Sequence, residues 1–104
     1  MKKRVVAYVP DLLDRSKVAA AGEVTFVSRP DVLAEAAAAA GADVVVVDLT
    51  RPGVLEALPG IGIPVIAFAN HTRRDLMDAA AAGGGAEVMA RSAFFARIEE
   101  LLGG

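Results

Sequence analysis

A chain of 104 residues, 55% of them hydrophobic, is long enough to fold as one domain with a substantial core. The absence of cysteine excludes disulfide bonds, thiolate catalysis and thiolate metal sites. A formal net charge of −2 gives no positive field for nucleic acid, and the apolar runs are shorter than the ~20 residues of a membrane-spanning helix. We therefore expect a single cytoplasmic domain, residues 1–104, that binds neither nucleic acid nor membrane directly.

The predicted elements alternate between apolar, β-rich strands and helices that end near Gly or Pro. In chain order, they are a strand over 4–9, a helix from 12 to near Gly22, a strand over 23–28, a helix over 32–40, a strand over 44–47, a helix over 54–58, a strand over 64–69, a helix over 73–82, a strand over 87–90 and a helix over 93–102.

The central strand is the most informative element. Val44 to Val47 follow one another without a polar residue and end at Asp48. An uninterrupted β-branched run is typical of a strand buried on both faces, as in a parallel sheet covered by helices. Five strands alternating with helices therefore predict an α/β fold, a three-layer sandwich around a five-stranded parallel sheet with right-handed crossovers.

Polar residues follow the strands. If the strand order is 2-1-3-4-5, the residues after strands one, three, four and five converge on one crevice at the carboxyl edge of the sheet, where ligands bind in open parallel sheets. These residues are Asp11, Asp48, Thr50, Arg51, Asn70, His71, Arg91 and Ser92. Asp48, directly beyond the central strand, is the first candidate for a functional residue.

The order and spacing of these segments resemble the receiver domain of bacterial two-component response regulators, the chemotaxis-type domain with a flavodoxin-like fold. The resemblance covers nearly the whole chain and depends on Asp48 with Pro52 four residues later, on Pro64-Val-Ile-Ala-Phe68 and on Gly85-Ala-Glu-Val-Met-Ala-Arg91. It implies a role in signal transduction, with Asp48 at the phosphoacceptor position. It also implies a stand-alone receiver without an output domain, so that any effect would be exerted through a partner.

The residues that would perform the family's chemistry are largely replaced. Val9 and Pro10 occupy the positions of the two carboxylates that hold Mg²⁺, Ala69 that of a Ser or Thr, Arg91 that of a lysine, and Ser92 that of a proline. Phosphoryl transfer depends on positioned positive charge, the metal above all, and Mg²⁺ requires oxygen ligands. The leading hypothesis is therefore a non-catalytic pseudo-receiver, without cofactor or metal, that contacts a protein partner or a second copy of itself.

Two alternatives remain open. In the first, the chain is a phosphoaccepting response regulator in which Asp11 and Asp48 still hold Mg²⁺. In the second, it is a small domain that binds an anion or nucleotide through Arg51, Arg91 and Ser92. No Ser-His-Asp set, metal-ligand cluster or pair of catalytic carboxylates is apparent, so we expect no enzymatic activity.

Three of these side chains also have ordinary structural interpretations. Asp48 is expected to pair with Arg91 or to cap a turn, because arginine can hold a carboxylate through two hydrogen bonds. Asp11 is expected to be the N-cap of the helix that follows. His71, the only histidine, is expected to lie exposed in a loop.

A possible interaction face involves two aromatic residues. Phe94 and Phe95 are consecutive on the last helix and cannot face the same way, so one of them is expected to emerge beside Leu76 or Met77. In receivers, the corresponding helices and strand form the dimer or partner face.

Overall fold

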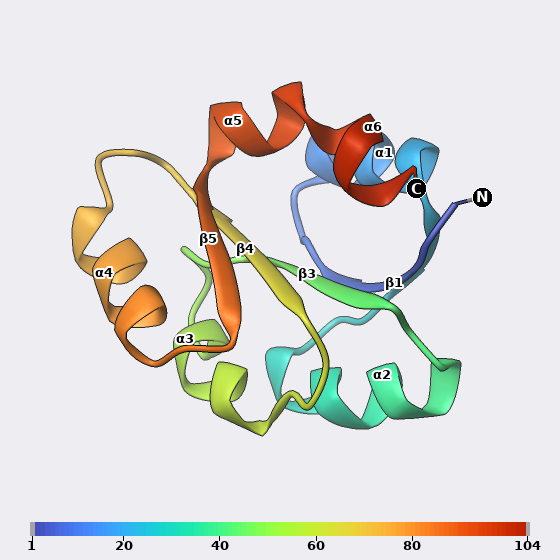
Figure 1. The fold of residues 1–104 in the computed structure, drawn as a ribbon, viewed down its shortest axis with the longest axis horizontal. Helices are drawn as coiled ribbons and strands as arrows, with labels where there is room; N and C mark the ends of the chain where they lie inside the picture. The colour runs from blue at the N-terminus through green and yellow to red at the C-terminus, as the bar shows by residue number, and fades with distance from the viewer. Residues whose placement is uncertain (1, 104) are drawn as a thin grey trace.

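The computed structural model describes residues 2–103 as a five-stranded, entirely parallel sheet with helices on both faces (Figure 1). The strand order is β2-β1-β3-β4-β5, which confirms the predicted three-layer, flavodoxin-like arrangement. Among the described residues, no helix combines the length and the apolar character required to cross a bilayer.

The strands are short and the helices stop close to the predicted glycines and prolines. The strands are β1 (Arg4–Tyr8), β2 (Glu23–Phe26), β3 (Val44–Asp48), β4 (Val65–Ala69) and β5 (Ala86–Ala90). The helices are α1 (Leu12–Ala21), α2 (Leu33–Ala40), α3 (Val54–Ala57), α4 (Arg74–Ala82), α5 (Arg91–Ala96) and α6 (Ile98–Leu102), with 3-10 turns η1 (Pro30–Val32) and η2 (Leu58–Gly60).

The valine run forms the centre of the sheet, as predicted. Successive side chains of a strand point to opposite faces, so Val44 and Val46 enter one core and Val45 and Val47 the other. The first core lies under α1, α5 and α6, and the second under α2, α3 and α4 (Figure 1). All four valines are buried because helices cover both faces.

The last helix differs from its prediction. It is interrupted at Arg97, where α5 ends and α6 begins, although the sequence contains no Pro or Gly there. The break lets α5 pack on the sheet beside β4 while α6 packs against α1. The backbone N–H of Lys3 also donates to the carbonyl of Leu102, which joins the two ends of the described chain.

The structure places the four residues of the predicted interaction face on opposite faces of the sheet. Phe94 is fully buried and Phe95 is half-buried, and both pack against Phe68 with ring centroids 4.9 and 5.3 Å from its own. Leu76 and Met77 belong to the core on the opposite face of the sheet. Phe95 does not emerge beside them because consecutive positions on this short helix both lean toward β4.

Helix α1 has an unexpected phase. Its buried residues are Asp14, Val18 and Ala21, whereas Leu12 and Leu13 are each 75% exposed. Positions i, i+4 and i+7 share one face of a helix, so a helix capped at Asp11 with Val18 inward also carries Asp14 inward.

Candidate functional site

The carboxyl ends of four strands surround a small pocket of about 150 Å³. It is lined by Asp11, Asp14, Asp48, Thr50, Arg51, Phe68, Ala69, Asn70 and Arg91. The predicted convergence of the loops after strands one, three, four and five is therefore found in the structure. Five predicted site residues line this pocket: Asp11, Asp48, Thr50, Asn70 and Arg91, with Arg51 from the predicted anion-binding set beside them.

Asp48 is held by its own neighbours in sequence. The backbone N–H of Thr50 donates to Oδ1 of Asp48 at 3.0 Å, and the Thr50 hydroxyl donates to the same oxygen at 2.6 Å. Nε of Arg51 lies 3.5 Å from Oδ2. The carboxylate thus caps the turn that leads out of β3, which is the turn-capping role expected for it.

Arg91 pairs with Asp14, and the expected Asp48–Arg91 pair is therefore replaced by a different one. Nη2 of Arg91, at the start of α5, donates to Oδ1 of Asp14 on α1. The Asp14 side chain is 3% exposed and the Arg91 side chain 40% exposed. Arg91 also lies over the ring of Phe95, 5.0 Å from its centroid. The guanidinium therefore joins α1 to α5 and neutralises a buried carboxylate.

Asp11 is the N-cap of α1, as predicted. Its Oδ1 accepts a hydrogen bond from the backbone N–H of Asp14 at 3.0 Å. This hydrogen bond lowers the pKa of Asp11 below its ordinary value, and the positive charges of Arg91 and Arg51 act in the same direction. The Asp11 carboxylate thus interacts with the charges of the pocket, while its Oδ1 caps α1.

Two predicted site residues lie outside the pocket. His71 and Ser92 are exposed and do not line it, which agrees with the loop position expected for His71. Val9 and Pro10, which the resemblance to receiver domains assigns to the metal-carboxylate positions, do not line the pocket: Val9 is buried in the core under α1 and Pro10 is half-buried.

The sequence interpretation missed Asp14. Its spacing from Val18 and Ala21 is the signal that could have identified it, because all three residues share the buried face of α1. A carboxylate on that face needs a cation, and Arg91 is the cation that the fold brings to it.

The charge of the pocket determines what it can bind. Three carboxylates, from Asp11, Asp14 and Asp48, face two guanidiniums, from Arg51 and Arg91, which leaves a formal excess of one negative charge. Both guanidiniums are already paired with carboxylates. Among residues 2–103, no three His, Cys, Asp or Glu side chains are grouped so that they could hold a metal ion. The charged side chains of the pocket therefore form two ion pairs, Arg51 with Asp48 and Arg91 with Asp14, while Asp11 caps α1.

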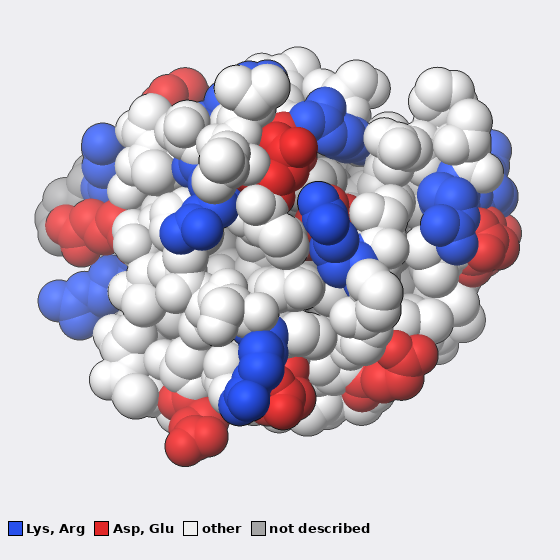
Figure 2. Space-filling view, turned by 180° about the vertical axis from the view of Figure 1, so that it is seen from behind, with Lys and Arg blue, Asp and Glu red and all other residues white. Residues whose placement is uncertain are grey.

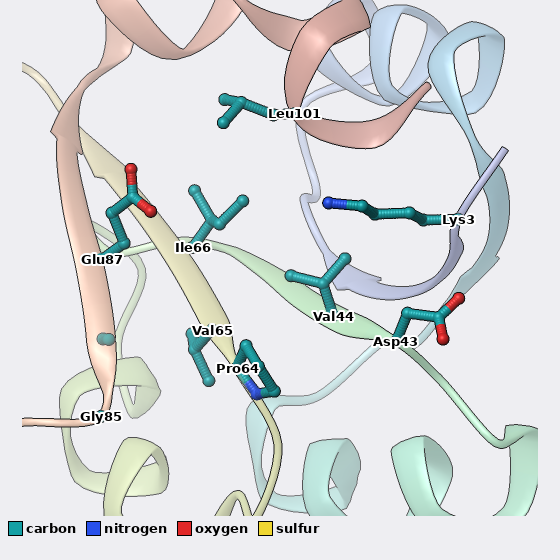
Figure 3. Close-up of a pocket in the computed structure, with 10 residues that line it drawn as sticks. Lys3, Asp43, Val44, Pro64, Val65, Ile66, Gly85, Glu87 and Leu101 are labelled. Atoms are coloured by element: carbon teal, nitrogen blue, oxygen red, sulfur yellow. The ribbon is translucent and has the colours of Figure 1, made fainter. Parts of the chain in front are cut away.

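A larger pocket, of about 440 Å³, lies at the opposite, amino edge of the sheet (Figure 3). Val44 and Ile66 form its apolar floor beneath Leu101, and the side chains of Lys3 and Glu87 extend over that floor from opposite sides. Lys3 and Glu87 are exposed. Asp14 and Asp48, the buried acids of the described chain, both lie at the other edge, so the charged residues that the fold buries belong to the carboxyl-edge site.

On the face shown in Figure 2, basic and acidic side chains are interspersed, without the continuous basic area that a nucleic-acid-binding face requires.

No protein-family model matches this sequence, and a search of curated proteins gives no match. Inferences about function therefore depend on the fold and on the carboxyl-edge site.

Proposed function

We propose that this chain is a receiver-like signalling module that acts through protein–protein contact and does not use phosphoryl transfer. The observation that carries the proposal is the arrangement of Asp48 and Arg91. The carboxylate at the phosphoacceptor position accepts hydrogen bonds from Thr50 and Arg51, while the cation after β5 is committed to Asp14.

Both sets of interactions oppose the use of Asp48 as a phosphoryl acceptor. An attacking carboxylate needs an accessible oxygen. It also needs cations nearby that neutralise the negative charge of the incoming phosphoryl group. Oδ1 of Asp48 already receives two hydrogen bonds. Releasing Arg91 would leave the Asp14 carboxylate buried without a partner, which is strongly unfavourable. The ion pairs thus favour one fixed state of the site.

The same contacts bear on the two alternatives. For an anion or nucleotide, Arg51 and Arg91 would have to leave their carboxylates in a pocket with excess negative charge. For a phosphoacceptor assisted by Mg²⁺, Asp11 and Asp48 would have to coordinate the ion although Oδ1 of each already caps α1 or the turn after β3. A protein-contact role requires neither change, so it is the proposal that the geometry supports best.

The test is a titration of the ¹⁵N-labelled protein with Mg²⁺, followed by beryllofluoride, which imitates an aspartyl phosphate. We expect no saturable shifts at the amides of Asp48, Thr50, Asn70 and Arg91. Saturable shifts that require both components and are lost in Asp48→Asn would overturn the proposal in favour of a phosphoacceptor. Inorganic phosphate alone provides the other arm, in which saturable shifts that are lost in Arg91→Gln would indicate an anion site.

A further inference from the structure

The exposed surface of α1 is more apolar than a solvent-facing helix needs to be. Leu12 and Leu13, in its first turn, are each 75% exposed and are the large hydrophobic side chains most open to water among the described residues. Single exposed leucines are common, but two adjacent ones form a local apolar patch.

The patch continues along the helix as a stripe. Successive residues of an α-helix are rotated by about 100°, so Ser16, Ala19 and Ala20 lie on the same side as the two leucines, opposite the buried Asp14, Val18 and Ala21. All five stripe residues are exposed, and none has a charged side chain. We call these five residues, Leu12, Leu13, Ser16, Ala19 and Ala20, the α1 stripe.

Two cations border the α1 stripe, one on each side. Arg15 lies over the ring of Phe26 on β2, 4.6 Å from its centroid, and Lys17 lies over the ring of Phe95 on α5, at 5.1 Å. Neither forms an ion pair with a carboxylate among residues 2–103, whereas most of the other arginines do. The acid of α1, Asp14, is buried against Arg91. The exposed face of α1 is therefore uncharged along its centre, with one positive side chain at each margin.

We propose that this face docks an acidic amphipathic helix of another protein. The partner's apolar residues would cover the α1 stripe while its carboxylates on both flanks would pair with Arg15 and Lys17. A partner helix of this kind would present apolar residues at i, i+3, i+4 and i+7 on the side that faces α1. The inference rests on the proposed function, since it identifies the partner class for the contact-based role.

Charge distinguishes this occupant from two others. A second copy of the chain packing through the same face would bring Arg15 and Lys17 against their own equivalents, and like charges across an interface oppose association. Anionic membranes are bound by clusters of four to eight basic residues or by helices with a wide apolar face, whereas α1 offers two cations and a stripe with only two large side chains.

The experiment uses three synthetic amphipathic helices of about 15 residues that share one leucine pattern and carry Glu, Gln or Lys on both flanks. Each is titrated into the ¹⁵N-labelled chain. We expect the Glu peptide alone to give saturable shifts centred on Leu12, Leu13 and Ser16. Leu12→Gln with Leu13→Gln should weaken its binding about a hundredfold, because each buried leucine is worth about a factor of ten. Arg15→Gln with Lys17→Gln should remove most of the salt dependence.

The controls separate the alternatives. Arg74→Gln removes another exposed cation that pairs with no carboxylate among residues 2–103, but it lies on α4 and should leave binding unchanged. Equal binding of the Lys and Glu peptides, or shifts away from α1, would overturn the inference. Self-association of the chain would also overturn the inference if the double leucine variant abolished it. The same holds for sedimentation with vesicles of equal parts phosphatidylcholine and phosphatidylglycerol.

The two proposals also fail separately. A beryllofluoride response with intact binding of the Glu peptide would refute the proposal that Asp48 does not accept a phosphoryl group. It would leave the proposed contact at the α1 stripe supported. If the protein binds no peptide and shows no response to beryllofluoride, the proposed contact at the α1 stripe is refuted. The proposal that Asp48 does not accept a phosphoryl group is then still supported.

Discussion

The Asp14–Arg91 pair gives the sharpest energetic prediction. Arg91→Ala would leave a carboxylate that is 3% exposed without its partner, and breaking a buried pair in this way costs about 3–5 kcal/mol. Because the guanidinium is 40% exposed, part of the pair already sees water, and we expect a loss near the lower end, about 3 kcal/mol. For a domain of this size, that corresponds to a decrease in melting temperature of about 10–15 °C. Asp14→Ala should cost less, about 1–2 kcal/mol, since the freed guanidinium can turn to solvent.

The assay is urea unfolding followed by circular dichroism, from which the free energy of unfolding is extrapolated. Arg97→Ala is the matched control because it breaks an exposed pair, Arg97 with Glu100 at 3.1 Å, worth about 0–1 kcal/mol. The double variant Asp14→Leu with Arg91→Met should lie within about 1 kcal/mol of the wild type, since apolar side chains can replace a buried pair. The reasoning is refuted if Arg91→Ala costs no more than Arg97→Ala, or if the double variant loses the sum of the single losses.

Three further predictions concern local contacts. Asp48→Ala leaves the Thr50 N–H and hydroxyl without their acceptor and should reduce the free energy of unfolding by about 1–3 kcal/mol in urea, with Asp48→Asn losing less. Because the pKa of Asp11 is lowered in the folded state, its contribution to stability is present above pH 3.8 and is lost as pH falls through the folded-state pKa. In Asp11→Asn, the free energy of unfolding should therefore depend less on pH in that range. Gly53→Ala, at φ +84° and with its new Cβ 3.1 Å from Pro30, should lower the melting temperature by several degrees, whereas Gly60→Ala should not.

Each of these predictions has its own contrary result. For Asp48, the result would be an alanine variant as stable as the wild type, which would mean that the turn after β3 forms without its cap. For Asp11, an unchanged acid-unfolding curve in the asparagine variant would show that other carboxylates govern that range. For the glycines, equal melting temperatures of the two alanine variants would contradict a steric origin, because a Cβ at Gly60 meets no atom within 4 Å.

The fold could be predicted because its main determinants are local. Four consecutive valines identify a strand buried on both faces, and Gly41 ends α2 in the left-handed conformation that favours glycine. The break at Arg97 could not be predicted, because it depends on where two helices pack. Phe94 and Phe95 are drawn toward Phe68 on β4, while Leu102 is buried in the same core beside α1.

The site was predictable as a place but not as a set of contacts. The strand order 2-1-3-4-5 brings Asp11, Asp48, Asn70 and Arg91 together. The alternation of strands and helices predicts a parallel sheet, and the convergence of these residues was predicted on the condition of that order. Which carboxylate Arg91 selects depends on the rotation of α1 about its axis, and a sequence containing both Asp14 and Asp48 does not specify that rotation. The resemblance to receiver domains concerns the positions of Val9 and Pro10 and gives no indication of Asp14, one turn later in the chain.

The rotation of α1 links the two proposals physically. Capping by Asp11 fixes where the helix begins, and packing of Val18 fixes which side is inward. Together they place Asp14 beside Arg91 and leave Leu12 and Leu13 facing water. A helix turned by about 100°, one residue, would bury Leu13 together with Lys17, or Leu12 together with Arg15. The observed phase keeps Val18 in the core and both cations at the surface, and it leaves the two leucines exposed. An interface that covers the leucines would add their burial to the stability of the complex.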